Sequence, residues 1–108
     1  MALAVRVLLR VAVPALGGHV AEIIIRPPSR SVFNAMAARR GAGGFADEAV
    51  VHFAARLSGH SEGTIKRIEA ADFAEVRGIV EKLYEGAARR FRTGRPANGN
   101  GESGGEAA

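Results

Sequence analysis

The sequence lacks cysteine and tryptophan, and it contains one tyrosine and four prolines in 108 residues. Without cysteine the chain cannot be a disulfide-stabilised scaffold, and it offers no thiolate to a metal or a nucleophilic mechanism. No stretch approaches the roughly 20 apolar residues that a membrane-spanning helix needs. The apolar N-terminus is interrupted by Arg6 and Arg10, which argues against an export signal. We therefore expect a soluble, cytoplasmic protein.

The chain is basic without being strongly charged. Its 15 Lys and Arg residues exceed 11 Asp and Glu residues by a net charge of +4, and Arg greatly outnumbers Lys. Ala, Gly and Arg together dominate the composition, which GC-rich coding would also produce. Net charge bears on solubility and non-specific binding more than on a defined role. We favour general basicity over a dedicated phosphate-binding face, so a nucleic-acid partner is not expected.

The first quarter of the sequence predicts a β-hairpin. Apolar residues alternate with other residues from Val5 to Val13, which predicts a strand with one buried face. Residues 20–26 form a second β-branched run, and the Pro27-Pro28 pair ends it. Pro14 and the glycines at 17 and 18 supply turn residues, so we expect an antiparallel hairpin with a loop of about six residues.

Helical patterns occupy the next two thirds. Ser29 or Ser31 is a suitable N-cap for a helix that ends before Gly41, Asp47 is a natural cap for a second helix, and Ser61 can start a short third one. The longest candidate runs from residue 70 to about residue 90, although two internal glycines weaken its distal part. Residues 93–108 contain no large apolar side chain and are expected to be disordered. The prediction is a single α+β domain over residues 1–92, with an N-terminal antiparallel hairpin followed by three or four helices.

Groups for catalysis or metal binding are few. His52 and His60 are eight residues apart without a second pair of ligands, so no metal site is predicted. His52 has no nucleophile or orienting carboxylate beside it in sequence and is interpreted as an ordinary, partly buried histidine. The glycine-rich loop at 41–44 follows a helix and lacks the residues of a phosphate-binding loop. We predict no enzyme activity and no cofactor.

One alternative is a small DNA-binding regulator using residues 49–69. Ala55, Gly59 and Ile65 have the spacing that lets two helices of a helix-turn-helix cross closely. Against it, the residues flanking the glycine are Ser58 and His60 where apolar residues are expected. The second helix would also balance two basic residues with two acidic ones, whereas a DNA-facing helix should be positive.

Read over a longer stretch, the sequence resembles the tail assembly chaperones of Mu-like and P2-like phages, of the tail assembly protein E type. The resemblance rests on residues 22–29 at the end of the hairpin, residues 53–59 (Phe-Ala-Ala-Arg-Leu-Ser-Gly), residues 65–68 and the run Ala-Ala-Asp-Phe at 70–73. It covers roughly residues 5 to 84, and the order and spacing of the motifs agree.

This resemblance implies a non-enzymatic assembly factor that binds the tape-measure protein while the tail tube polymerises. Whether it also binds other tail components stays open. It further implies a location in the bacterial host cytoplasm and absence from the mature virion. Its oligomeric state, including a homo-oligomer, stays open. Phe33 and Met36 are candidate partner-binding residues, although core packing is the favoured alternative for both. A second hypothesis gives Arg89, Arg90, Arg92 and Arg95 the role of attracting acidic segments of the partner.

Overall fold

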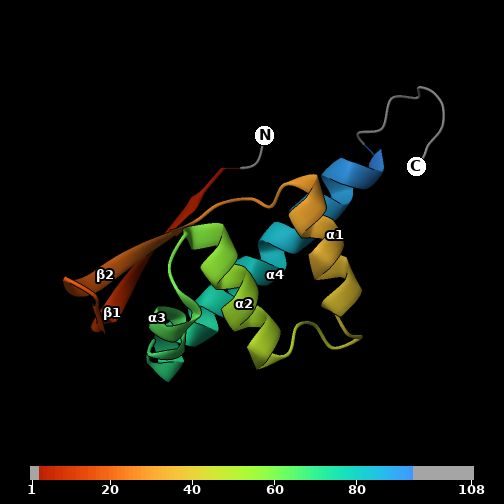
Figure 1. Ribbon diagram of the computed structural model, residues 1–108. Helices are drawn as coiled ribbons and strands as arrows, with labels where there is room; N and C mark the ends of the chain where they lie inside the picture. The colour runs from red at the N-terminus through yellow and green to blue at the C-terminus, as the bar shows by residue number, and fades with distance from the viewer. Residues whose placement is uncertain (1–2, 94–108) are drawn as a thin grey trace.

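The computed structural model describes residues 3–93 and confirms the α+β class. An N-terminal two-stranded hairpin is followed by four helices along the chain (Figure 1). The elements are β1 (Val5–Ala15), β2 (Gly18–Ile25), α1 (Arg30–Arg39), α2 (Asp47–Ser58), α3 (Glu62–Lys66) and α4 (Ala70–Thr93). Of the tail predicted to be disordered, Thr93 ends α4, and residues 94–108 lie outside the described part of the chain.

The hairpin turn is tighter than the sequence analysis predicts. Ala15 pairs with Gly18, so the loop consists of Leu16 and Gly17 alone. The prediction of a loop of about six residues is wrong. Gly17 and Gly18 have φ angles of 85° and 152°. Glycine adopts such angles without a steric penalty, which lets the chain reverse its direction within this short loop. Both strands consequently extend further toward the tip than their apolar patterns indicate.

Strand β1 contains a large irregularity that the alternating pattern conceals. Pairing is regular up to Leu8 opposite Glu22 and resumes at Val13 opposite Val20, so residues 9–12 of β1 stand opposite Ala21 alone. The extra residues shift the side-chain alternation. Val11, which the pattern places on the buried face, is 47 % exposed, and that part of the prediction is wrong.

The helix caps follow the sequence in two cases out of three. The hydroxyl of Ser29 accepts a hydrogen bond from the backbone N–H of Val32, and that of Ser61 accepts one from Thr64, as predicted for α1 and α3. The predicted cap of α2 is wrong, because the capping position is Ala46 and Asp47 is already the first helical residue. Its carboxylate forms an ion pair with Arg77 of α4 instead. Asp47 therefore ties α2 to α4.

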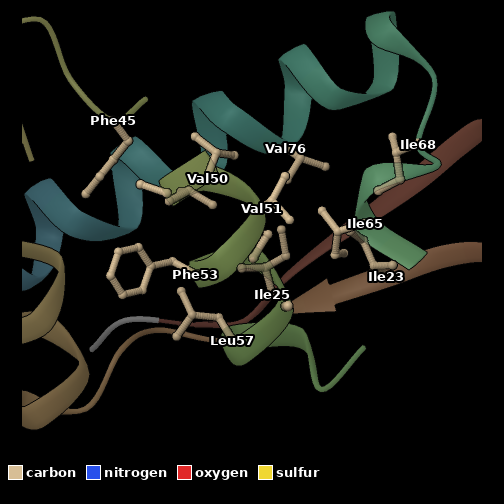
Figure 2. Packing of buried hydrophobic residues seen from close by; sticks show 14 of the residues in the cluster. Ile23, Ile25, Phe45, Val50, Val51, Phe53, Leu57, Ile65, Ile68 and Val76 are labelled. Carbon is tan, nitrogen blue, oxygen red and sulfur yellow. The ribbon is translucent and has the colours of Figure 1, made fainter. Parts of the chain in front are cut away.

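The core lies between the inner face of the hairpin and the helices (Figure 2). The hairpin contributes its inward-facing residues, and α2 contributes nearly a whole side of its surface. Among the largest fully buried side chains are Val7, Val13, Ile23, Ile25, Met36, Val50, Phe53, Ile65, Val76 and Val80. Burial of this apolar surface provides the main stabilisation of the fold.

Helix α4 remains helical past its internal glycines and continues to Thr93, a little beyond the predicted end. Ala87 and Ala88 in its last turns are buried, and the Phe33 ring of α1 stacks on Tyr84 with centroids 5.2 Å apart. Packing against α1 offsets the intrinsic cost of the glycines. No helix within residues 3–93 is long and apolar enough to cross a membrane.

The described part of the chain is elongated, with extents of 50 × 26 × 19 Å. In Figure 1 the hairpin and α3 lie toward one end, and α1 with the last turns of α4 lies at the other, while α2 packs between them. The two ends are therefore separate surfaces.

Candidate functional site

The hairpin carries the exposed large apolar side chains of the described residues. Leu8 is 63 % exposed, Ile24 is 38 % exposed, and Leu16 at the turn is fully exposed. Val11 in the irregular part of β1 and Leu3, which precedes the strand, complete the set. Isolated exposed apolar residues are common in soluble proteins, but their concentration on one element marks a candidate interaction surface.

The outer face of the sheet combines apolar and charged residues. Arg6 lies opposite Ile24, and Leu8 lies opposite Glu22. The Arg6 guanidinium is 3.7 Å from the Glu22 carboxylate, which gives a diagonal ion pair across this face. Among the described residues no third strand joins the hairpin, so β1 and β2 each have an open edge. We call Leu8, Ile24 and the two charged residues the outer hairpin face.

A buried carboxylate holds the hairpin on the helices. Asp72, in the first turn of α4, has no exposed surface and accepts hydrogen bonds from the backbone N–H groups of Arg10 and Val11 at 2.9 and 3.2 Å. Its other oxygen accepts from the Arg10 guanidinium at 2.9 Å. At the opposite end of the sheet, the backbone N–H of Arg26 donates to the carbonyl of Leu57. These bonds fix which face of the hairpin turns outward.

The two apolar residues proposed to bind a partner lie in different surroundings. Met36 has no exposed surface and belongs to the core, so it lines no open groove in this structure. Phe33 is half-buried between Tyr84 and Phe91, with ring centroids at 5.2 and 5.4 Å. The packing alternative therefore describes Met36 fully, and it describes Phe33 in part.

The predicted basic residues lie near the end of α4. Arg89 and Arg90 are exposed, and an Nη of Arg90 donates to the carbonyl of Pro28 at 3.2 Å. Arg92 is in α4, but its side chain is outside what the structure describes, as is all of Arg95. Because α1 packs against this part of α4, it brings three further arginines to the same end of the molecule, Arg30, Arg39 and Arg40. The available sequence signal was the lack of any acidic residue between positions 22 and 47.

A pocket of about 380 Å³ opens between the end of α1 and the last turns of α4. It is lined by Arg40, Tyr84, Glu85, Ala88 and Arg89. The Arg40 guanidinium lies over the Tyr84 ring at 5.0 Å from its centroid and donates two hydrogen bonds to Glu81 at 3.1 and 3.0 Å. The pocket is therefore polar and has arginine on two sides.

The histidines and acidic residues form no metal-binding cluster within the described residues. His52 is half-buried, and its Nδ1 is 3.0 Å from a carboxylate oxygen of Glu62, which links α2 to α3. No nucleophilic side chain is bonded to this pair in the part of the chain that the structure covers. In this position His52 contributes to the contact between two helices.

The segment proposed as a helix-turn-helix forms the expected turn. Gly59 ends α2 with a left-handed φ of 81°, Ala55 is nearly buried, and Ile65 is fully buried. The second helix, α3, has only five residues, and two of them, Thr64 and Ile65, are buried. At about 1.5 Å per residue it is little more than one turn long, which leaves a small surface for the major groove.

Comparisons with protein-family models, with curated proteins and with solved structures gave no match for this chain.

Proposed function

We propose that this protein is a non-enzymatic tail assembly chaperone of a phage or prophage, which binds the tape-measure protein through its hairpin while the tail tube assembles. The single observation that carries the binding mode is the concentration of exposed apolar side chains on the hairpin, above all Leu8 and Ile24. The phage assignment itself comes from the sequence resemblance. On this proposal the protein acts in the bacterial host cytoplasm and is not part of the mature virion.

The hairpin suits a partner that supplies an amphipathic helix or an extended strand. Open sheet edges accept an added strand through backbone hydrogen bonds, and an outward apolar face accepts the apolar side of a helix. A two-stranded hairpin alone is marginally stable, and here the helices cover only its inner face. Asp72 and the buried residues of the hairpin hold the outer face rigid, which lowers the entropic cost of binding.

A DNA-binding regulator is the second candidate, favoured by the close packing of Ala55 and Ile65 around the Gly59 turn. It would have to read DNA with the exposed residues of α3, among them Lys66. Duplex binding that persists at physiological salt and is lost on Lys66→Glu would favour this candidate over the chaperone.

The chaperone proposal is tested by co-expression with the tape-measure protein of the same phage or prophage. The expected result is a soluble complex that co-purifies through size-exclusion chromatography. The double variant Leu8→Ser, Ile24→Ser should weaken the complex by about tenfold or more, since two exposed apolar anchors are removed. Leu16→Ser is the comparison variant, because it removes an equally apolar and more exposed side chain from the turn and so shows whether binding needs the sheet face or the hairpin as a whole.

A complex that forms equally well with the double variant would refute the hairpin as the binding surface. Failure of the wild-type chain to bind any tail component, together with turnover of a small-molecule substrate, would refute the chaperone proposal as a whole. Thermal unfolding of each variant shows whether it is folded. Leu8 is 63 % exposed and Ile24 is 38 % exposed, so the double variant should lose no more than about 1–2 kcal/mol of stability and stay folded.

A further inference from the structure

The end of the molecule opposite the hairpin gathers arginines from two segments about fifty residues apart in the sequence. We call this set the basic end. It comprises Arg30 and Arg39 of α1, Arg40 directly after α1, and Arg89 and Arg90 of α4. The α1 helix contains no acidic residue, and α4 contains none between Glu85 and Thr93. The fold, and not a local run of charge, creates this surface.

Among the described residues, carboxylates neutralise the positive charge of the basic end only in part. Two of them, Glu81 and Glu85, lie near it. Glu81 is engaged by Arg40 and by the backbone N–H of Phe45 at 2.9 Å, so it offers little to the remaining arginines. The rest of the chain has more evenly matched charges, as at α3, where Glu62 precedes Lys66. The five arginines of the basic end therefore outnumber the two carboxylates near it.

The pocket at this end has room for an anionic group. Its 380 Å³ lie between arginines at positions 40 and 89, with the side of the Tyr84 ring as a wall. Guanidinium groups bind carboxylates through two parallel hydrogen bonds, and a partly enclosed site strengthens such bonds relative to open solvent. A carboxylate side chain of another polypeptide is of the right size and charge.

Two observations favour an acidic polypeptide over a nucleic acid. Single-stranded nucleic acids stack their bases on open aromatic faces. Here the Phe91 ring has the guanidiniums of Arg30 and Arg90 at 5.3 and 4.5 Å from its centroid, and Phe33 stacks on Tyr84. Guanidinium groups or other rings thus already contact these aromatic rings. The second observation is the carboxylate of Glu85 in the pocket lining, which repels the backbone phosphates of a nucleic acid, whereas carboxylates on flexible side chains can turn away from it.

We propose that the basic end is a second binding surface, specific for an acidic segment of a partner polypeptide and independent of the hairpin. The two surfaces share no residue and are built from different elements, the hairpin on the one hand and α1 with the end of α4 on the other, so both can be occupied at once. Engaging two segments of one partner raises the overall affinity, because the second contact forms at high effective concentration. The basic end binds acidic polypeptides whether or not the partner is a phage tail protein.

The test compares two triple variants with the same net charge. Arg30→Glu, Arg39→Glu, Arg89→Glu alters the basic end. The control variant, Arg56→Glu, Lys66→Glu, Arg67→Glu, alters three exposed basic residues on the α2 and α3 side, of which Arg67 has one contact with the Pro14 carbonyl at 3.5 Å. Arg40 and Arg90 stay unchanged in both, because their hydrogen bonds to Glu81 and to the Pro28 carbonyl support the fold. Circular dichroism and thermal unfolding confirm that each variant is folded.

The probes are fluorescein-labelled poly-L-glutamate and a labelled single-stranded oligonucleotide of about 20 nucleotides, measured by fluorescence anisotropy at about 20 mM and about 150 mM salt. The basic-end variant should bind poly-L-glutamate at least about tenfold more weakly than the wild type, and the control variant less than about threefold more weakly. Equal losses in the two variants would show that net charge alone drives binding and would overturn the proposal. Tighter binding of the oligonucleotide than of poly-L-glutamate, lost in the basic-end variant, would overturn the assignment to polypeptides.

A second comparison tests the pocket with the opposite sign. Glu85→Gln removes the exposed carboxylate from the pocket lining and should tighten the binding of poly-L-glutamate by about twofold to threefold. Glu48→Gln changes the net charge equally at the start of α2 and should leave the affinity unchanged. Equal effects of the two substitutions would show that the pocket takes no part in binding.

Discussion

The attachment of the hairpin to the helices should depend on one carboxylate, and Asp72→Ala tests this dependence. Asp72 is fully buried and accepts hydrogen bonds from two backbone N–H groups and one guanidinium. The two N–H groups belong to Arg10 and Val11, in the part of β1 that has lost its pairing with β2. Without the carboxylate these donors have no partner among the described residues. The irregular part of β1 then loses the hydrogen bonds that hold it in place.

The expected loss of stability in Asp72→Ala is the sum of the contributions of the backbone hydrogen bonds and of the ion pair. A buried backbone donor left without an acceptor costs about 1–3 kcal/mol. Two donors are affected here, and both bonds are only partly buried, so entry of water reduces the sum. The Arg10 side chain is 65 % exposed, so its ion pair with Asp72 is screened and contributes about 0–1 kcal/mol. We therefore expect Asp72→Ala to lower the free energy of unfolding by about 2–4 kcal/mol, a large share of the stability of a small domain.

Two further substitutions separate the backbone bonds from the ion pair. Asp72→Asn keeps one acceptor oxygen for the backbone and should cost about 1–2 kcal/mol, whereas Arg10→Ala leaves both backbone bonds in place and should cost at most about 1 kcal/mol. Urea unfolding followed by far-UV circular dichroism gives the three values. The loss caused by Asp72→Ala should change little between low and high salt, because hydrogen bonds to backbone groups are weakly screened.

Amide hydrogen exchange shows which part of the chain is loosened by Asp72→Ala. In Asp72→Ala the amides of Arg10 and Val11 should exchange faster than in the wild type by a larger factor than the amide of Ile65 in α3. Two results would refute the role given to Asp72. One is a loss of unfolding free energy in Arg10→Ala as large as in Asp72→Ala, and the other is a loss below about 1 kcal/mol in Asp72→Ala.

Three other substitutions test the packing of the helical body, each by its shift in the free energy of unfolding. Gly44→Ala should destabilise by about 1–3 kcal/mol, because φ at Gly44 is +105° and an added Cβ would lie 2.5 Å from the Glu81 carboxylate; a neutral result would contradict this geometry. Gly78→Ala should stabilise by about 0.5–1 kcal/mol, since Gly78 is exposed within α4 and its Cβ would meet nothing within 4 Å; destabilisation would contradict it. Ile65→Ala should cost about 2–5 kcal/mol because the side chain is fully buried, and a smaller loss would show that the core is less tightly packed there.

Local sequence patterns were sufficient to identify the elements and their order. The apolar residues that alternate around Val5 and Val7 face the core, as their pattern predicts. The β-branched run forms the second strand, and the apolar residues at helical spacing in α2 and α4 also turn inward. The serines at 29 and 61 cap their helices, since capping depends on residues within three positions of the cap. Each of these features is fixed by neighbours in the sequence.

The features that were missed depend on distant residues. The irregular part of β1 is bound by a carboxylate 62 residues further along the chain, so no local pattern could show that Val11 would turn outward. Asp47 is the first residue of α2 instead of its cap, and its carboxylate pairs with Arg77, 30 residues away. The basic end was only half visible for the same reason, because the arginines of α1 join those of α4 through the contacts of Phe33.

The irregular part of β1 also bears on how the hairpin can pair with a partner. Open strand edges invite uncontrolled association, and proteins limit it with charges, prolines and irregular strands. Arg6, the interruption at residues 9–12 and Pro14 provide all three on β1. Strand addition to this edge is thereby restricted to the segment before the interruption, beside Leu8. Asp72→Ala removes the acceptor that organises the interruption, so it should increase self-association of the purified protein in sedimentation experiments, whereas the exposed substitution Leu8→Ser should decrease it.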